Sequence, residues 1–306
     1  MDDPLAQAIL KTLHYADIFD FPLTGAELER YLIGVRATSP EIKATLLELT
    51  QCQGRIAAVD RFFTLPSRQP IVAERLRLKQ QAQGQAPRAH FYGRLLGYFP
   101  FVRMVAITGA LAMENARDND IDLLIVCAPG RLWMVRGAAI ALVRLARLRG
   151  DHLCPNFLIT ENRLGVAEEN LYNAHEIVQM IPLYGLNLYR RLRRANTWVD
   201  RFLPNVDRTD KAYVPESFDA FGLWLKRMGE RLLGGRAGEA IEQWEMSRKV
   251  RKLSAQIPPN ADDVEFSSEA CRGFISGHSR RILAEFTRRT QELEPAQNRE
   301  EMALAR

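Results

Sequence analysis

Residues 105–126 read VAITGALAMENARDNDIDLLIV, and this stretch carries the most informative pattern in the chain. One apolar run stops just before Gly109, and Asp120 and Asp122 lead directly into a second apolar run. Both runs predict β-strands, and the alternation of side chains along a strand places the two aspartates on one face, about 7 Å apart. Two carboxylates opposite a helix start that follows a glycine predict a Mg²⁺ site next to a phosphate-binding turn.

Several neighbouring residues are candidates for holding the phosphate groups. The backbone amides of Gly109 and Ala110 would receive phosphate oxygens, and Thr108 offers a nearby hydroxyl group. Arg131 and Arg136 lie near the start of the helix expected after the second strand, and an arginine has a fork of donors suited to a triphosphate. We therefore predict that these five residues bind a nucleotide.

The order of elements around this stretch predicts an α/β core over residues 100–166. An α/β core is expected where strands and helices alternate along the chain. The expected elements are a strand at 102–107, a short helix, a strand at 121–127, a helix at 129–149 and a strand at 157–160.

The N-terminal region, residues 1–68, predicts a winged-helix-like domain of three helices and a hairpin. Thr24 and Glu27 have the spacing of a capping box, so the second helix is expected to begin near Ala26. A third helix is expected from Ser39 to Gly54. Two short β-prone runs follow, at 55–59 and 61–65.

The charge of the third helix bears on what this domain binds. A DNA-reading winged helix needs a basic recognition helix, whereas Lys43 is offset here by Glu41 and Glu48. DNA binding is therefore not expected, and the balanced charge of this helix disfavours a function as a transcriptional regulator.

The remaining regions are expected to be mainly helical. Residues 69–99 predict a connector of two helices, 70–83 and 87–96, with a break between them. Residues 167–294 predict a helical domain with breaks at prolines, and residues 295–306 predict a disordered tail. An arginine cluster at 190–194 is either a solvated face or a surface for a polyanionic acceptor.

Composition limits the broad class of protein. The chain has 306 residues, 47% apolar and 26% charged, with a formal net charge of +5. These values are typical of a globular protein and exclude collagen-like, low-complexity and wholly disordered chains. The four cysteines show no C-x-x-C pair, and the most apolar stretch, 132–148, is interrupted by arginines. We expect a cytoplasmic protein with no membrane association and no zinc site.

The quoted stretch resembles the nucleotidyltransferase superfamily, which includes DNA polymerase beta, the aminoglycoside nucleotidyltransferases and the minimal nucleotidyltransferases. Their signature is an apolar residue, Gly, then Gly or Ser, a gap of about nine to thirteen residues, and Asp-x-Asp among apolar residues. More narrowly, the chain resembles an uncharacterised prokaryotic branch with an N-terminal winged helix. The segments that carry this likeness are 15–28, 130–136, 154–159, 173–185 and 196–205.

The resemblance implies a fold, a reaction and its ligands. The implied fold is an α/β (α+β) core with a mixed sheet, flanked by an N-terminal winged-helix domain and a C-terminal α-helical domain. It implies transfer of a nucleoside monophosphate from a nucleoside triphosphate, such as ATP, to an acceptor hydroxyl. Asp120 and Asp122 would be catalytic and would bind Mg²⁺ or Mn²⁺. The acceptor is not identified: a protein, an RNA end and a small molecule all remain open.

Two departures from the family pattern leave an alternative open. Ala110 stands where many members have Ser, and Asn156 stands where the third carboxylate is usual. An amide oxygen binds metal but is neutral and is not a base. Asn156 would therefore complete the metal shell weakly, and Glu161 or Glu176 is the alternative. The competing hypothesis is a catalytically degenerate member of the fold that acts as a nucleotide sensor or scaffold.

Overall fold

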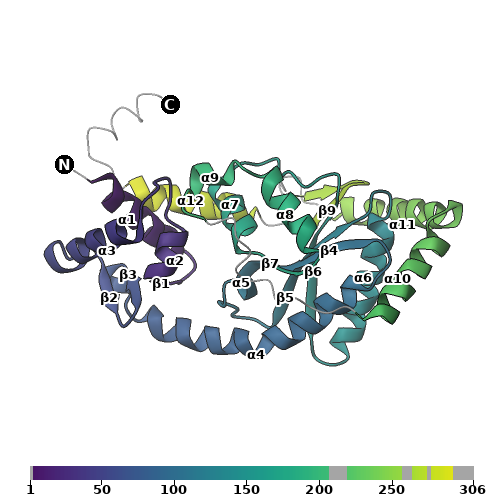
Figure 1. The fold of residues 1–306 in the computed structure, drawn as a ribbon, viewed down its shortest axis with the longest axis horizontal. Helices are drawn as coiled ribbons and strands as arrows, with labels where there is room; N and C mark the ends of the chain where they lie inside the picture. The colour runs from purple at the N-terminus through teal and green to yellow at the C-terminus, as the bar shows by residue number, and fades with distance from the viewer. Residues whose placement is uncertain (1–2, 207–218, 257–263, 274–276, 292–306) are drawn as a thin grey trace.

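The computed structural model describes residues 3–206, 219–256, 264–273 and 277–291. It shows a mixed α/β structure in which an N-terminal unit is joined by one long helix to a mixed sheet (Figure 1). The predicted tail at 295–306 and the predicted break at Pro258 lie outside the described residues.

The central sheet has six strands in the order β7-β4-β5-β6-β9-β8. β5 and β6 are parallel, and every other neighbouring pair is antiparallel. The strands are β4 (Val102–Ile107), β5 (Asp120–Cys127), β6 (His152–Thr160), β7 (Ile181–Tyr184), β8 (Val264–Phe266) and β9 (Ala270–Gly273). The sheet is therefore mixed, as predicted.

Two helices connect the three central strands in the predicted order. α5 (Gly109–Ala112) follows β4, and α6 (Leu132–Arg147) crosses from β5 to β6. The parallel pairing of β5 with β6 requires such a crossover. β6 begins earlier than expected, at His152, so the third core strand is longer than its apolar part.

Residues 167–294, predicted as a mainly helical domain, contain six helices in their described part but also supply β7, β9 and β8 to the sheet, which the prediction missed. These strands have three or four residues each. They include Pro182, Arg272 and Gly273, and they show no run of alternating apolar residues. Strands this short at the margins of a sheet leave little periodic signal in a sequence.

Helices cover both faces of the sheet. The face that carries Met104, Leu124 and Val126 packs against α7 (Leu171–Gln179), α8 (Leu186–Ala195) and α9 (Val199–Phe202). The opposite face packs against α4 (Ile71–Gly97) and α6. The remaining helices are α10 (Ala220–Leu233), α11 (Arg236–Ser254) and α12 (His278–Gln291). Within the described ranges, none of the helices combines the length and the apolar character that crossing a bilayer requires.

The N-terminal unit contains the three helices and the hairpin predicted for it. Its small sheet has the antiparallel order β1-β3-β2. Its elements are α1 (Pro4–Asp17), β1 (Leu23–Thr24), α2 (Gly25–Arg30), α3 (Ser39–Leu47), β2 (Ala57–Val59) and β3 (Phe62–Thr64). The capping box is confirmed, since the Thr24 hydroxyl accepts from the Glu27 amide and the Thr24 amide donates to the Glu27 carboxylate. α3 continues beyond Leu47 as a π-helical turn.

The predicted break in the connector is also wrong, because α4 runs unbroken past Pro87. A proline inside a helix removes one backbone hydrogen bond and costs about 3 kcal/mol. Tertiary packing offsets this cost, since Leu78, Ala82 and Ala89 on this helix are almost completely buried. Gln85 also donates to the backbone oxygen of Asp118, so α4 supports the loop that precedes β5.

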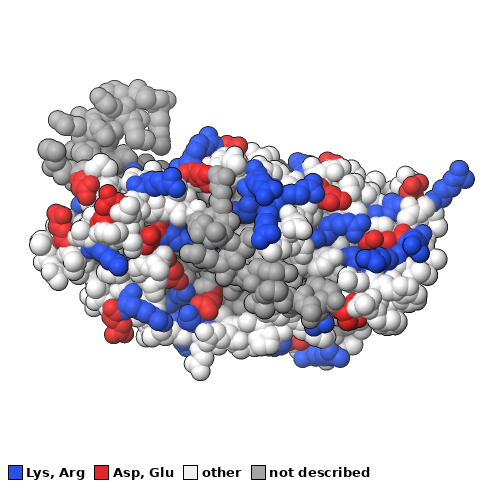
Figure 2. Space-filling model, in the orientation of Figure 1, with Lys and Arg blue, Asp and Glu red and all other residues white. Residues whose placement is uncertain are grey.

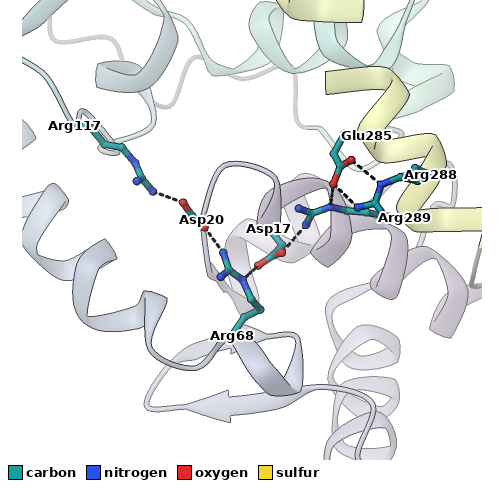
Figure 3. A network of polar contacts seen from close by, with 7 residues as sticks. All are labelled: Asp17, Asp20, Arg68, Arg117, Glu285, Arg288 and Arg289. Atoms are coloured by element: carbon teal, nitrogen blue, oxygen red, sulfur yellow. Dashed lines mark hydrogen bonds and ion pairs between the residues drawn. The ribbon is translucent and has the colours of Figure 1, made fainter. Parts of the chain in front are cut away.

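A network of ion pairs joins distant parts of the chain (Figure 3). Asp17 at the end of α1 accepts from Arg68 at 2.7 Å and from Arg289 of α12 at 2.6 Å. Asp20 pairs with Arg68 and, at 2.6 Å, with Arg117 in the loop before β5. The N-terminal unit, the loop before β5 and α12 are therefore linked electrostatically.

Candidate functional site

The two aspartates of β5 lie on the same face of the sheet, in agreement with the alternation of the strand. They precede Leu124 on the face that α7 covers. The Asp120 side chain is 41% exposed, and its Oδ1 lies 3.6 Å from Nδ1 of His152. The amide of Thr108 donates to the backbone oxygen of Asp122 at 3.0 Å, which fixes the end of β4 beside the acidic pair.

Glycine is required at position 109 because the backbone there approaches Asp122 closely. Its φ of +63° lies in the left-handed region that favours glycine. A Cβ atom on this residue would lie 2.7 Å from Oδ2 of Asp122. Ala110, the next residue, is exposed at the start of the short α5. The turn therefore brings backbone, without a side chain, against the Asp122 carboxylate.

A β-bulge in β6 directs Asn156 toward Asp122. Asp122 pairs with Cys154, but Leu124 pairs with Phe157, so β6 contains one extra residue here. Nδ2 of Asn156 donates to Oδ1 of Asp122. Pro155 is the sequence signal for this feature, because a proline inside a sheet is confined to edges and bulges. Bulges often re-aim a side chain next to a functional site.

Burial, together with neighbouring negative charge, raises the pKa of two carboxyl groups at this site. Burial raises the pKa of Asp122 to about 6, and the nearby Asp118 and Asp120 carboxylates add to this effect. Burial also raises the pKa of Glu176 to about 7, with a further contribution from Asp122, while Arg272 opposes the rise. The site thus holds several carboxylates in partly desolvated surroundings, which makes their ionised forms unfavourable. A bound cation would stabilise the ionised carboxylates.

The structure distinguishes between the two candidates for the third carboxylate. Glu176 lies on α7, close enough to Asp122 for the two charges to interact. Glu161 lies at the opposite end of the sheet, where its amide donates to the backbone of Cys127 and its carboxylate is 3.8 Å from Arg191. The site therefore brings together Asp120, Asp122 and Asn156, with Glu176 facing them, and it excludes Glu161.

The residues of this site fit a bound Mg²⁺ ion only in part. In the described part of the chain, no group of three or more His, Cys, Asp or Glu side chains is placed to hold a metal ion. Magnesium is usually bound through one or two carboxylates together with substrate phosphates, not by a cage of protein ligands. Asp120 and Asp122 fit that mode of binding, with phosphate oxygens supplying further ligands.

Arg131 and Arg136 are not part of this site. Arg131 is buried and donates to the backbone oxygens of Gly130 at 2.6 Å and Gly234 at 2.7 Å. Arg136 donates to the thiol of Cys271. The reason is topological, because α6 starts beyond the far end of β5, about 17 Å of strand away from Asp122. Both arginines are therefore close to Asp122 in the sequence but not in the fold.

Two cavities adjoin this site and share Glu176, whereas Asp120 and Asp122 are not among the residues that line them. The sheet cavity has a volume of about 320 Å³ and is lined by Thr108, Asn156, Glu176 and Arg272, among others. The aromatic cavity has a volume of about 190 Å³ and lies between the N-terminal unit and α7. Gly109 and Ala110 line this second cavity, whereas Thr108 lines the sheet cavity.

Two residues of the sheet cavity were not predicted for this site. Arg272 belongs to β9, and its guanidinium lies 5.6 Å from the centre of the Phe157 ring. His278 is at the start of α12 and lines both cavities. No local pattern connects either residue with Asp122, because β9 and α12 come from a part of the chain far from Asp122 in sequence.

Comparison with known proteins does not identify a family. No protein-family model matches the chain, and neither a curated protein nor a solved structure does. Conclusions about function therefore depend on the geometry and chemistry of this site.

Proposed function

We propose that the protein is a magnesium-dependent nucleotidyltransferase that moves a nucleoside monophosphate from a nucleoside triphosphate to an acceptor hydroxyl. The observation that carries this proposal is the pair Asp120 and Asp122 on one face of β5, with Gly109 against one carboxylate and Glu176 nearby. Mg²⁺, or Mn²⁺, held by the two aspartates would neutralise charge on the triphosphate and on the leaving pyrophosphate.

The sheet cavity is the proposed nucleotide site. Its volume of about 320 Å³ lies in the range of small-molecule pockets. Arg272 offers a fork of donors to phosphate oxygens, and Thr108 adds a hydroxyl group. In this proposal Arg272 takes the role that the sequence had suggested for Arg131 and Arg136, and Thr108 keeps the role predicted for it.

Glu176 is the proposed general base. In the reaction, the acceptor oxygen forms a bond to the α-phosphorus, the bond from that phosphorus to the bridging oxygen breaks, and pyrophosphate leaves. The proton of the acceptor hydroxyl passes to the Glu176 carboxylate. A pKa of about 7 suits this role, because a general base works best when its pKa is near the operating pH.

Pyrophosphate release tests the proposal. The assay uses each of the four nucleoside triphosphates with Mg²⁺ or Mn²⁺ and a panel of protein, RNA and small-molecule acceptors. Asp122→Asn and Glu176→Gln should each reduce turnover by about 10²-fold or more. Glu161→Gln is the matched control at the other end of the sheet and should keep full activity. Turnover that is absent, or that survives Asp122→Asn, would contradict the proposal.

A nucleotide sensor is the second candidate, and one observation favours it. The side chain that faces Asp122 from β6 is the neutral Asn156, where a third carboxylate would strengthen metal binding. A sensor would bind nucleotide at the sheet cavity without releasing pyrophosphate. Nucleotide binding that Arg272→Ala weakens, with no turnover for any nucleotide or acceptor, would favour the sensor over the enzyme.

A further inference from the structure

The long helix α4 carries a buried amide side chain that reaches the loop in front of β5. α4 runs from the N-terminal unit to the sheet (Figure 1), and Gln85, in the middle of this helix, is 2% exposed. Its Nε2 donates to the backbone oxygen of Asp118 and to Oδ1 of Asn119, both at 3.0 Å. Since a carbonyl oxygen only accepts, the contact with Asp118 fixes which end of the amide faces the loop.

Gln85 interrupts an apolar stretch of the buried face of α4. Leu78, Ala82 and Ala89 lie on that face at helical spacing and are almost completely buried. A buried polar side chain is costly unless it is hydrogen-bonded. Replacing it by an apolar side chain of similar shape is therefore nearly neutral for stability, provided that its partners reach water. Both of its partners belong to exposed residues of the loop, so the two hydrogen bonds matter more for the position of the loop than for the stability of the fold.

The turn that Gln85 holds leads directly into the proposed metal site. Asn119 is adjacent to Asp120, the first residue of β5. The amide of Asp120 donates to Oδ1 of Asp118 at 3.4 Å, which links the start of the strand to the same turn. In the described sheet, the backbone of Asp122 is held by both neighbouring strands, whereas Asp120 is paired with β6 alone. The position of the Asp120 carboxylate therefore depends on the turn.

The same face of α4 also fixes the start of the neighbouring parallel strand, β6. The hydroxyl group of Tyr92, two turns after Gln85, donates to Oδ2 of Asp151 at 2.7 Å. Asp151 directly precedes His152, whose Nδ1 lies 3.6 Å from Oδ1 of Asp120. Two polar side chains of one helix face thus hold the starts of the two strands that meet at the acidic pair.

We propose that Gln85 is a positioning residue for the metal ion, because it holds the turn before β5 so that Asp120 shares a divalent cation with Asp122. This inference rests on the proposed function and assigns a further residue to it. Gln85 does not touch the ion, and it acts through its hydrogen bonds to Asp118 and Asn119. Removing a group that orients a metal ligand typically lowers metal affinity by roughly 10–100-fold. Since Gln85 acts through an adjacent turn, we expect a loss of about tenfold.

The first experiment measures the affinity of the full chain for Mn²⁺ alone, without nucleotide, from the EPR signal of the free ion. Gln85→Met keeps a long, unbranched side chain in the buried position but removes both hydrogen bonds, so it should weaken Mn²⁺ binding about tenfold. Gln83→Met, the same substitution at an exposed position of α4, should leave the affinity unchanged. Without metal, both variants should melt within about 2 °C of wild type. A merely structural residue would instead lower the melting temperature and leave the metal affinity unchanged.

A double-mutant cycle tests the same contact from the side of the loop. Asn119 is exposed, so Asn119→Ala removes one acceptor of the Gln85 amide without disturbing the core. This variant should weaken Mn²⁺ binding about threefold on its own and should have no further effect when combined with Gln85→Met. Two effects that multiply, or an Asn119→Ala protein with unchanged affinity, would contradict transmission through this hydrogen bond.

Turnover separates a failure of this inference from a failure of the proposed function. In the pyrophosphate assay, Gln85→Met should need about tenfold more Mg²⁺ for half-maximal turnover and should approach the wild-type rate at saturating Mg²⁺. Wild-type turnover together with equal Mn²⁺ affinity in Gln85→Met would overturn the inference and leave the proposed function intact. Weaker Mn²⁺ binding by Gln85→Met, without turnover by wild type, would support the positioning role and overturn the proposed reaction. The absence of any Mn²⁺ site that Asp122→Asn removes would overturn both.

Discussion

Replacing Asp122 by asparagine should stabilise the protein at neutral pH while it reduces turnover by about 10²-fold or more. The pKa of Asp122 is raised from 3.8 to about 6, so the folded state binds its proton more tightly than the unfolded state does. Stability is therefore lost as the pH rises from about 4 to about 6, and the full penalty is present above that range. Asparagine carries no charge and keeps an oxygen that accepts from Asn156.

The size of this stabilisation follows from the shift in the pKa of Asp122. About two pKa units at 1.36 kcal/mol each correspond to about 3 kcal/mol at pH 8. An unfolding entropy of about 2.1 cal/mol/K per residue gives about 0.6 kcal/mol per degree for a chain of this length. Asp122→Asn should thus raise the melting temperature by about 5 °C at pH 8, with the gain vanishing below about pH 4.

The assay compares wild type with Asp122→Asn by thermal and urea unfolding between pH 4 and pH 8. Asp60→Asn is the matched control, because Asp60 is exposed in the N-terminal hairpin and should change stability by less than about 0.5 kcal/mol. A difference between wild type and Asp122→Asn that is independent of pH, or a variant less stable at pH 8, would refute the reasoning about buried charge.

Four further predictions follow from the site and the fold. In Glu176→Gln, the rise of the transfer rate with pH near 7 should disappear, because the carboxylate of wild type must lose its proton to act as a base; a rate profile from pH 5.5 to 9 that is unchanged would exclude this role. Mg²⁺ should raise the melting temperature of wild type more at pH 8 than at pH 5 and have little effect on Asp122→Asn; an equal shift in both proteins would place the ion elsewhere. Gly109→Ala should cost about 1–2 kcal/mol because of its positive φ, and turnover should fall at least tenfold as the new Cβ displaces the Asp122 carboxylate; full turnover would show that the close approach is dispensable. Gly185→Ala should cost about 3 kcal/mol or more in urea unfolding, because its Cβ would lie 2.1 Å from the backbone oxygen of Arg103; a neutral result would contradict the position of β7.

The sequence was sufficient to predict the parts of the fold that carry strong local signals. The strands around Gly109 and Asp122 and the helix after them are long or apolar enough to be recognised, and the capping box at Thr24 is specific. α4 shows the limit of local reasoning, because Pro87 predicts a break that buried contacts override. The same holds for β7 and β9, whose residues become strands only through pairing with the core.

Local sequence patterns likewise predicted only part of the candidate site. Asp120 and Asp122 could be placed on one face from strand periodicity alone, whereas the choice between Glu161 and Glu176 required the tertiary structure. Arg272 has no sequence signal, since β9 brings it to the site from a distant part of the chain. Pro155 is a sequence signal for Asn156, because it marks the bulge that directs this residue toward Asp122.

The strand order has a consequence for how the protein is made. β6 forms one of its two ladders with β9, and residue 270 follows residue 160 by 110 positions. At about 5–20 residues per second, a ribosome needs roughly 5–20 s to synthesise that interval. During this time the edge of β6 has no native partner and exposes unpaired backbone groups that favour aggregation. Nascent chains halted before β9 should therefore depend on chaperones far more than chains released after it.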